Sequence, residues 1–319
     1  RSLNNQTHLQ MVNTPPQTPA VERSFDQGFS VNINNNSSQD TIDDNDLTYV
    51  VGISSNKNGK YRKKMEDIHT FVENFNNKLD WGYFAIFDGH AGIEASKWCG
   101  KNLHDIIEHK INEDNDKDVR LIFNESFEEA DKEINNNLSG HSGCTAAVCI
   151  LRWEQKDSQD QNNNEMIDHR RMLYTANVGD SRIVLMRDSI ALRLTYDHKA
   201  SDPMECRRVE NIGGLVIKNR VNGMLAVTRS IGDKFFDTLV VSNPFTTKIE
   251  LTSKDEFMII ACDGLWDVME DQEACDFIVH NDLASDPQTA SELLIDHALK
   301  LGSADNITVM VISFKTYDA

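Results

Sequence analysis

The chain has 319 residues, and its 51 Asp and Glu against 32 Lys and Arg give a formal net charge of −19. So acidic a chain is a poor candidate for binding nucleic acid, whose phosphates require cations, or an anionic membrane surface. No apolar run approaches the roughly 18 residues that a membrane span needs. We therefore expect neither nucleic acid nor membrane as a partner, and the 39% of hydrophobic residues suffices for one large core.

Two segments lack the pattern of folded structure. Residues 1–46 contain three of the six prolines and a run of Asn and Ser from Asn32 to Gln39. Without hydrophobic periodicity, this segment is predicted to be a disordered tail. The polar segment 154–168 interrupts an apolar region and is predicted to be an insertion between two strands.

The rest of the chain alternates strand and helix patterns. Short apolar runs rich in β-branched and aromatic residues predict strands at 49–53, 82–87, 144–151, 172–178, 183–186, 191–194, 257–262 and 309–314. Apolar residues at helical spacing predict helices over 98–111, 119–134 and 285–301. Because the helices are grouped rather than following every strand, the pattern favours a layered α+β fold over a doubly wound one.

A basic run, Lys60-Tyr61-Arg62-Lys63-Lys64, stands out in this acidic chain. It has two interpretations, a solvated loop face or a nuclear-import patch. The acidic residues Glu66 and Asp67 follow it almost directly, so the basic run lies next to an acidic pair.

Acidic residues gather at the ends of the predicted strands. Asp88, Asp180 and Asp263 follow predicted strands, Asp305 precedes the last one, and Glu66 and Asp67 follow the basic run. Since strand ends meet at one edge of a sheet, these carboxylates are expected to converge. Two carboxylates about 4 Å apart repel by roughly 4 kcal/mol at an effective dielectric of 20, so the group requires protons or bound cations. Oxygen ligands alone favour Mg²⁺ or Mn²⁺ over zinc.

A pair of such ions would allow chemistry at phosphorus. Two ions about 3.5–4 Å apart clamp an in-line displacement and activate a water molecule. His90, beside Asp88, is a candidate to protonate a leaving alkoxide, or alternatively to orient a ligand. Arg62 offers a planar fork for a phosphate. These residues predict metal-assisted hydrolysis of a phosphoester.

The six cysteines lack the short paired spacings of a zinc site. Four of them stand in apolar runs, where a free thiol behaves as a small hydrophobic group. We therefore expect a reducing compartment, the cytoplasm or the nucleus.

From about Leu47 to Phe314 the chain resembles the metal-dependent Ser/Thr protein phosphatases of the protein phosphatase 2C family, and most closely its small fungal members. The motifs that carry the resemblance occur in family order. They are Arg62-x-x-Met65-Glu66-Asp67, Phe87-Asp88-Gly89-His90-Ala91-Gly92, Ser142-Gly143-Cys144-Thr145-Ala146, Asn177-Val178-Gly179-Asp180-Ser181-Arg182, Asp197-His198-Lys199, Gly213-Gly214, Leu225–Asp233, Cys262–Asp267 and Asp305–Val309. The resemblance implies a catalytic domain over 47–316 with a four-layer α-β-β-α sandwich, in which two mostly antiparallel sheets are flanked by pairs of antiparallel helices.

The resemblance also implies a ligand set for the two ions. Asp88 would bridge both ions, and Asp263 and Asp305 would bind the first. The Gly89 carbonyl would bind the second, where Glu66 would act largely through water.

Further roles follow from the same resemblance. Asp67 would hold metal-bound water, and Asp180 together with Asp263 would bind a weaker third ion. Arg62 would hold the phosphate, and His90 would serve as general acid. The family's flap corresponds to 197–233, where substrate selectivity is thought to lie.

The implied activity is Mg²⁺- or Mn²⁺-dependent hydrolysis of phosphoserine and phosphothreonine by a metal-bound hydroxide, without a phosphoenzyme. Family members often act on stress-pathway kinases, so the expected partners are phosphorylated signalling kinases, and the expected state is a monomer. Two alternatives stand beside it. One is a pseudophosphatase that serves as a binding module, and the other is a metal-dependent nuclease, which conflicts with the net charge.

Overall fold

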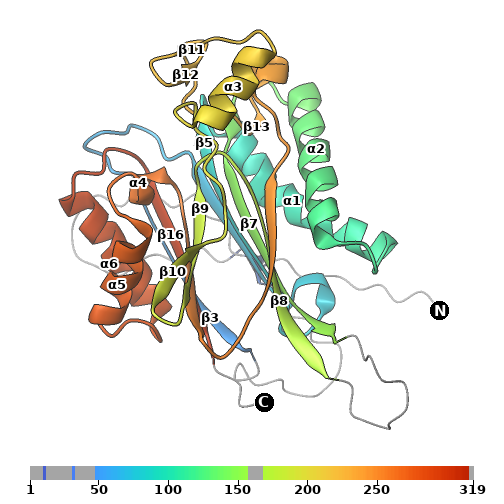
Figure 1. Cartoon of the computed structure of the whole chain (residues 1–319), viewed down its shortest axis with the longest axis vertical. Helices are drawn as coiled ribbons and strands as arrows, with labels where there is room; N and C mark the ends of the chain where they lie inside the picture. Colours follow the sequence, from blue (N-terminus) through green and yellow to red (C-terminus); the bar gives the residue numbers. More distant parts are fainter. Residues whose placement is uncertain (1–9, 12–30, 33–46, 157–167, 316–319) are drawn as a thin grey trace.

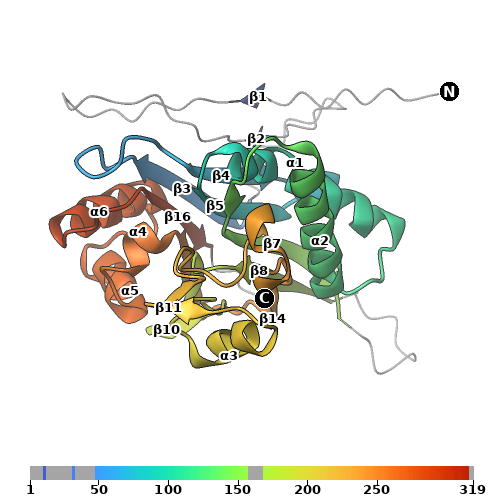
Figure 2. The same ribbon diagram turned by 90° about the horizontal axis from the view of Figure 1, so that it is seen from above.

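The computed structural model describes residues 10–11, 31–32, 47–156 and 168–315. Two β-sheets pack face to face, and helices cover the outer face of each (Figure 1 and Figure 2). Within the described part of the chain, every pair of neighbouring strands is antiparallel except β2 and β4. This architecture confirms the predicted α+β sandwich.

The larger sheet runs in the order β1-β2-β4-β5-β7-β8-β14, with β6 and β13 attached beside β5. Its strands are β1 (Gln10–Met11), β2 (Val31–Asn32), β4 (Asp67–Glu73), β5 (Gly82–His90), β6 (Gly143–Cys144), β7 (Ala146–Gln155), β8 (His169–Val178), β13 (Ile231–Gly232) and β14 (Phe245–Glu250).

The smaller sheet runs in the order β10-β9-β15-β16-β3. Its strands are β3 (Tyr49–Asn56), β9 (Arg182–Arg187), β10 (Ile190–Arg193), β15 (Asp255–Ala261) and β16 (Ile307–Phe314). A separate hairpin joins β11 (Val216–Ile217) to β12 (Arg220–Val221).

The helices are α1 (Glu94–Glu113), α2 (Val119–Asn137), α3 (Pro203–Asn211), α4 (Asp263–Trp266), α5 (Asp271–His280) and α6 (Pro287–Lys300), with short 3₁₀ turns η1 (Phe75–Asn77) and η2 (Lys234–Leu239). Side-chain caps determine where several of them begin. Asp118 accepts a hydrogen bond from the Arg120 amide at 2.9 Å, and Asp286 accepts one from the Thr289 amide at 3.2 Å. Such N-caps satisfy amides that have no partner within the helix.

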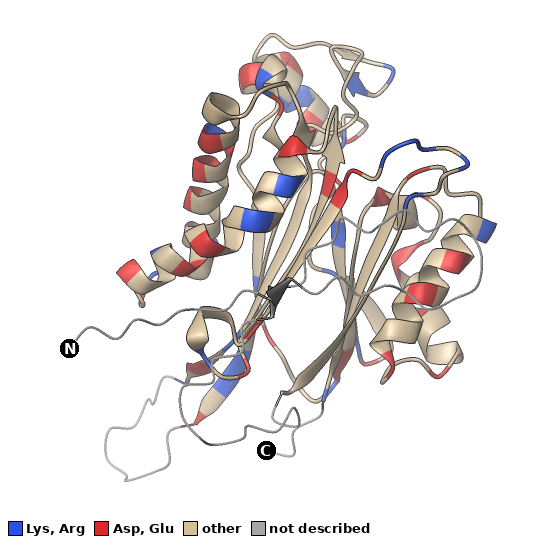
Figure 3. Ribbon diagram, turned by 180° about the vertical axis from the view of Figure 1, so that it is seen from behind, with Lys and Arg blue, Asp and Glu red and all other residues tan. Residues whose placement is uncertain are grey.

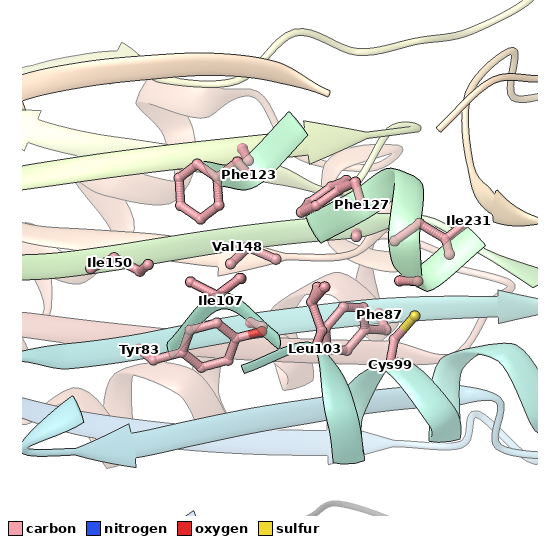
Figure 4. Close-up of a cluster of buried hydrophobic side chains, with 14 of the residues drawn as sticks. Tyr83, Phe87, Cys99, Leu103, Ile107, Phe123, Phe127, Val148, Ile150 and Ile231 are labelled. Atoms are coloured by element: carbon pink, nitrogen blue, oxygen red, sulfur yellow. The ribbon is translucent and has the colours of Figure 1, made fainter. Parts of the chain in front are cut away.

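Buried side chains fill all three spaces between the four layers. Helices α1 and α2 pack on the larger sheet through residues such as Leu103 and Phe127, which Figure 4 shows against Val148 of β7. Helices α4, α5 and α6 pack on the smaller sheet. Between the sheets lies a third cluster that includes Phe84 and Met258. No described helix is long and apolar enough to cross a membrane.

Each predicted strand and helix is present, and most extend by a few residues. The segment predicted as one strand at 144–151 is divided into β6 and β7 at Thr145. Among the elements that sequence reasoning missed are β4, β14, α3 and α5. The cysteines are free thiols, as expected, and five of the six are buried, with Cys206 of α3 partly exposed.

The two segments predicted to lack structure lie mostly outside the described residues. Strands β1 and β2 fall within 1–46, and β2 pairs with β4 at Val31 and Val72. The disordered tail otherwise stays a prediction. The polar insertion does lie between strands, β7 and β8, and its ends meet where the Lys156 amide donates to the Asp168 carbonyl at 2.9 Å.

Candidate metal centre

Strand register brings the predicted carboxylates to one end of the sandwich. In the larger sheet, Asp67 at the start of β4 lies directly opposite Asp88 near the end of β5. In the smaller sheet, the end of β15 pairs with the start of β16, so Asp263 and Asp305 lie at the same edge. Figure 3 shows acidic positions at this end of the strands, and others along the helices.

Two groups of possible ligands share one residue. Asp67, Asp88 and Cys262 offer ligand atoms that lie within 4.8 Å of one another, and so do Asp88, Asp180 and Asp263. Asp88 belongs to both groups and is therefore placed to contact two neighbouring ions. Four of the predicted ligands thus come together from strand ends that are far apart in the sequence, and Cys262, which was not predicted as a ligand, lies with them.

The carboxylates of this centre resist ionisation in the absence of cations. Burial raises the pKa of Asp67 and of Asp180 to about 6. Burial, and then repulsion by Asp263, raises the pKa of Asp88 well above its ordinary value. The pKa of Asp263 is raised likewise, first by burial and then by Asp180. A divalent cation would oppose these shifts, because its charge stabilises the ionised carboxylates.

Two buried carboxylate oxygens of this centre, Asp67 Oδ1 and Asp263 Oδ1, have no hydrogen-bond partner among the described residues. Buried polar atoms without partners are rare, and a bound ion is one of their ordinary explanations. The donors here are carboxylate oxygens, which suit Mg²⁺ or Mn²⁺. The Cys262 thiol donates to Asp67 Oδ2 and to the Asn306 carbonyl, at 3.4 Å each, so it is engaged with protein acceptors. The residues present therefore fit a pair of hard cations.

Arg62 reaches the edge of this centre. Its guanidinium NH2 nitrogen lies 2.8 Å from Asp305 Oδ2, and half of its side chain is exposed. Burial raises the pKa of Asp305, and the Arg62 charge opposes that rise. The guanidinium thus lies beside the carboxylates with donors left over, and its phosphate-binding role stays a prediction.

The backbone around Glu66 and Gly89 is closely packed. The Gly89 amide donates to the Glu66 carbonyl at 3.1 Å. A Cβ atom at Gly89 would lie 2.6 Å from that carbonyl oxygen and from Ser96 Oγ, so only glycine fits. Asn306 supports the same segment, because its Oδ1 accepts from the Glu66 amide at 3.0 Å. The predicted backbone ligand thus lies on a tightly held turn.

Asp180 is held by a turn and by a lysine. Gly179 has a φ of +87°, which favours glycine, and its amide donates to His198 Nδ1 at 3.2 Å. Lys199 Nζ lies 3.7 Å from Asp180 Oδ2 and partly compensates its charge. Asp180 therefore joins the centre with a cation nearby, unlike Asp88 and Asp263.

His90 contacts a residue to which sequence reasoning gave no role. Its Nε2 lies 2.6 Å from Asp233 Oδ2. Burial lowers the pKa of His90, but the hydrogen bond and the charge of Asp233 outweigh burial and raise it. Ser230 donates to the same carboxylate oxygen, and Gly143 leaves room for it, because a Cβ there would lie 2.2 Å from Asp233 Oδ2. Asp233 therefore favours a protonated His90 in one fixed orientation.

Comparison with known proteins agrees with this geometry. The family described as Protein phosphatase 2C matches residues 51–307. Protein phosphatase 2C homolog 1 of Saccharomyces cerevisiae is 61% identical over 84% of this chain and 94% of its own. The protein of the same name from Schizosaccharomyces pombe is 45% identical over 83% of this chain and 73% of its own.

Solved structures share the fold. A phosphatase from Toxoplasma gondii superposes with a TM-score of 0.70 at 22% identity, over 86% of this chain and 95% of its own. A sex-determining protein of Caenorhabditis elegans gives a TM-score of 0.69 at 26% identity, over 83% of this chain and 64% of its own.

The fold and its acidic centre define a metal-dependent protein-serine/threonine phosphatase. The chain belongs to the protein phosphatase 2C family, and its similarity to the two yeast proteins is consistent with a small fungal member.

Proposed function

We propose that this centre hydrolyses phosphoserine and phosphothreonine in proteins with two Mg²⁺ or Mn²⁺ ions, and that a third ion binds more weakly at Asp180. One observation supports the proposed pair of ions. Asp88 belongs to both groups of carboxylates, so its oxygens can serve two neighbouring ions at once. The lysine beside Asp180 supports weaker binding of the third.

The bound ions supply a water activated for attack and positive charge for the phosphate. The chain's own residues do the rest. Asp67 accepts a hydrogen bond from Thr308 Oγ1 at 2.8 Å, which leaves its second oxygen for water or an ion. Arg62 binds the phosphate at the rim. His90, held by Asp233, donates a proton to the departing serine or threonine oxygen.

The proposed substrates are phosphorylated signalling kinases, among them kinases of stress responses. The support comes from family resemblance and from relatives that are named as protein phosphatases. A location in the cytoplasm or nucleus is proposed with it, because the described cysteines are free thiols. We propose a monomer as the working form.

Turnover of a generic phosphothreonine peptide in Mn²⁺ tests this function. Hydrolysis is expected with Mn²⁺ or Mg²⁺ and is expected to stop in excess chelator. Full activity in chelator would overturn the metal mechanism, and absence of turnover with every divalent cation would favour the pseudophosphatase alternative. Substrates are then identified by comparing phosphoproteomes of cells with and without the active protein.

A further inference from the structure

The basic run singled out in the sequence forms part of the loop between β3 and β4, at the metal end of the sandwich. Figure 3 shows this loop in blue beside the acidic edge. Lys60, Lys63 and Lys64 are exposed. Among the described residues of this run, Arg62 is the one that forms an ion pair, and the three lysines are left without a carboxylate.

This loop is held firmly although its lysines are exposed. Asn58 lies at its start, and its carbonyl accepts from the amides of Tyr61 and Arg62 at 2.9 and 3.0 Å. The Asn58 side chain is buried and donates to the Ser303 carbonyl at 2.7 Å. The turn is therefore tied to the segment that carries Asp305.

A second amide fixes both ends of the loop. Asn306 Nδ2 donates to the Lys57 carbonyl at 2.8 Å and to the Lys64 carbonyl at 3.0 Å. Its Oδ1 accepts from the amide of Glu66. The lysines thus extend from a backbone whose position is set by the same residue that supports the metal ligands.

The location of these charges is unusual for the molecule. The chain has a net charge of −19, so most anions would be repelled, yet three lysines without a carboxylate partner stand within six residues of Glu66. The Lys60 ammonium lies over the Tyr61 ring, 4.9 Å from its centroid. The three lysines flank Arg62, which lies 2.8 Å from Asp305. A lysine ammonium is a flexible point charge that suits anions of varied geometry, whereas a fixed phosphate favours arginine.

We propose that Lys60, Lys63 and Lys64 form a recognition surface for an anionic segment next to the phosphorylated residue of the substrate. The bound group is an Asp or Glu side chain or a second phosphate in the same peptide. The inference rests on the proposed function, since it assigns a substrate class to the same centre. While Arg62 takes the phosphate to be hydrolysed, the lysines select peptides with further negative charge.

The test compares three phosphothreonine peptides that differ only in their flanks. One has alanines, one has glutamates and one has a phosphotyrosine. The variant K60A/K63A/K64A is measured against K78A/K254A/K315A, which removes the same charge from exposed lysines at the opposite ends of the strands. Hydrolysis of p-nitrophenyl phosphate in Mn²⁺ reports on the metal centre alone, because this small ester has no peptide flanks.

The intact protein is expected to prefer either anionic peptide over the alanine peptide by about tenfold in kcat/KM at low salt, as three exposed ion pairs together allow. The preference should disappear in K60A/K63A/K64A and in 0.5 M NaCl (about a 4 Å screening length), and it should persist in K78A/K254A/K315A. A response to the phosphotyrosine peptide alone would identify phosphate as the group bound, and a response to both would identify negative charge in general.

Two results would contradict the lysine recognition surface without contradicting the proposed phosphatase activity. Equal kcat/KM for all three peptides, with p-nitrophenyl phosphate still hydrolysed, would overturn the recognition surface and leave the phosphatase intact. A preference that survives K60A/K63A/K64A would overturn it as well, because another surface would then be responsible. Failure to hydrolyse p-nitrophenyl phosphate would instead count against the proposed function.

Discussion

Strand β15 has a carboxylate at each end, and the two differ in how their charge is compensated. At its start, Asp255 is fully buried and accepts from Arg187 Nε and NH2 at 2.7 and 2.8 Å. Just beyond its other end, Asp263 has an oxygen without a partner and lies among other carboxylates. Asp255 thus has its charge compensated by an arginine, which stabilises the fold. Asp263 has no such partner, and its carboxylate is left available for a cation.

Strand β5 repeats the contrast. Asp80, just before the strand, accepts from the Thr48 amide at 2.7 Å and from Trp153 Nε1 at 2.8 Å. Asp88, near the other end, faces Asp67 and shares a site with Asp180. One end of the sandwich therefore uses carboxylates for stability, and the other keeps them available for cations.

The largest effect is expected from substitutions of the carboxylates at the metal end of the sandwich. We expect D88A and D263N to lower kcat for a phosphothreonine peptide by about 10³-fold or more, since each change removes a ligand. Circular dichroism should show an intact fold. Activity within a few-fold of the unchanged protein would show that these carboxylates do not bind the catalytic ions.

The opposite end should respond in the opposite way. D255N leaves Arg187 without its buried partner, and we expect a loss of about 2–4 kcal/mol in the free energy of unfolding. Urea denaturation measures the loss, and kcat/KM measured below the transition should stay unchanged. A stable D255N protein would mean that Arg187, which is partly exposed, is readily solvated.

A pH series should separate the two ends without loss of a ligand. Since the pKa of Asp67 and of Asp180 is about 6 in the folded chain and about 4 when unfolded, the metal-free native state binds more protons between these values. Its stability should therefore fall as pH rises from about 4 to about 6. Calorimetry in chelator should show a falling Tm, with a shallower slope in D67N/D180N. Saturating Mn²⁺ should remove this pH dependence from the unchanged protein, because bound cations stabilise the ionised carboxylates.

A smaller effect is expected at the positioning residue. D233N leaves His90 without its anionic partner, and we expect kcat for a phosphothreonine peptide to fall about tenfold, because general acid assistance weakens. p-Nitrophenyl phosphate has a better leaving group and should be affected much less. In an H90Q background, D233N should add nothing, and a further full loss there would show that Asp233 acts elsewhere.

Sequence reasoning found the centre because its carboxylates directly follow or precede apolar strands, as Asp88 and Asp263 do. It missed β4, where the polar residues His69 and Thr70 are buried in the sheet and interrupt the apolar pattern. It also missed β14, in which only Phe245 and Ile249 are large apolar residues. Pairing in a sheet, rather than local composition, stabilises both strands.

Contacts between distant segments explain what else the sequence could not provide. His90 and Asp233 are 143 positions apart, and no local pattern joins them, although Asp233 stands in a motif shared with the family. The position of the basic loop is fixed by hydrogen bonds to Asn306, some 240 residues away. The charge of that loop was readable from the sequence, but its proximity to Asp305 required the fold.

The positions of the cysteines allow unfolding of the protein to be followed by chemical labelling of thiols. Five cysteines are buried and Cys206 on α3 is partly exposed. Burial raises the pKa of Cys149 well above its usual range and that of Cys275 to about 12, so neither reacts as a thiolate while the chain is folded. An alkylating reagent would label Cys206 first and the others only as each layer opens. The order of labelling would therefore give the order in which the two sheets lose their helices.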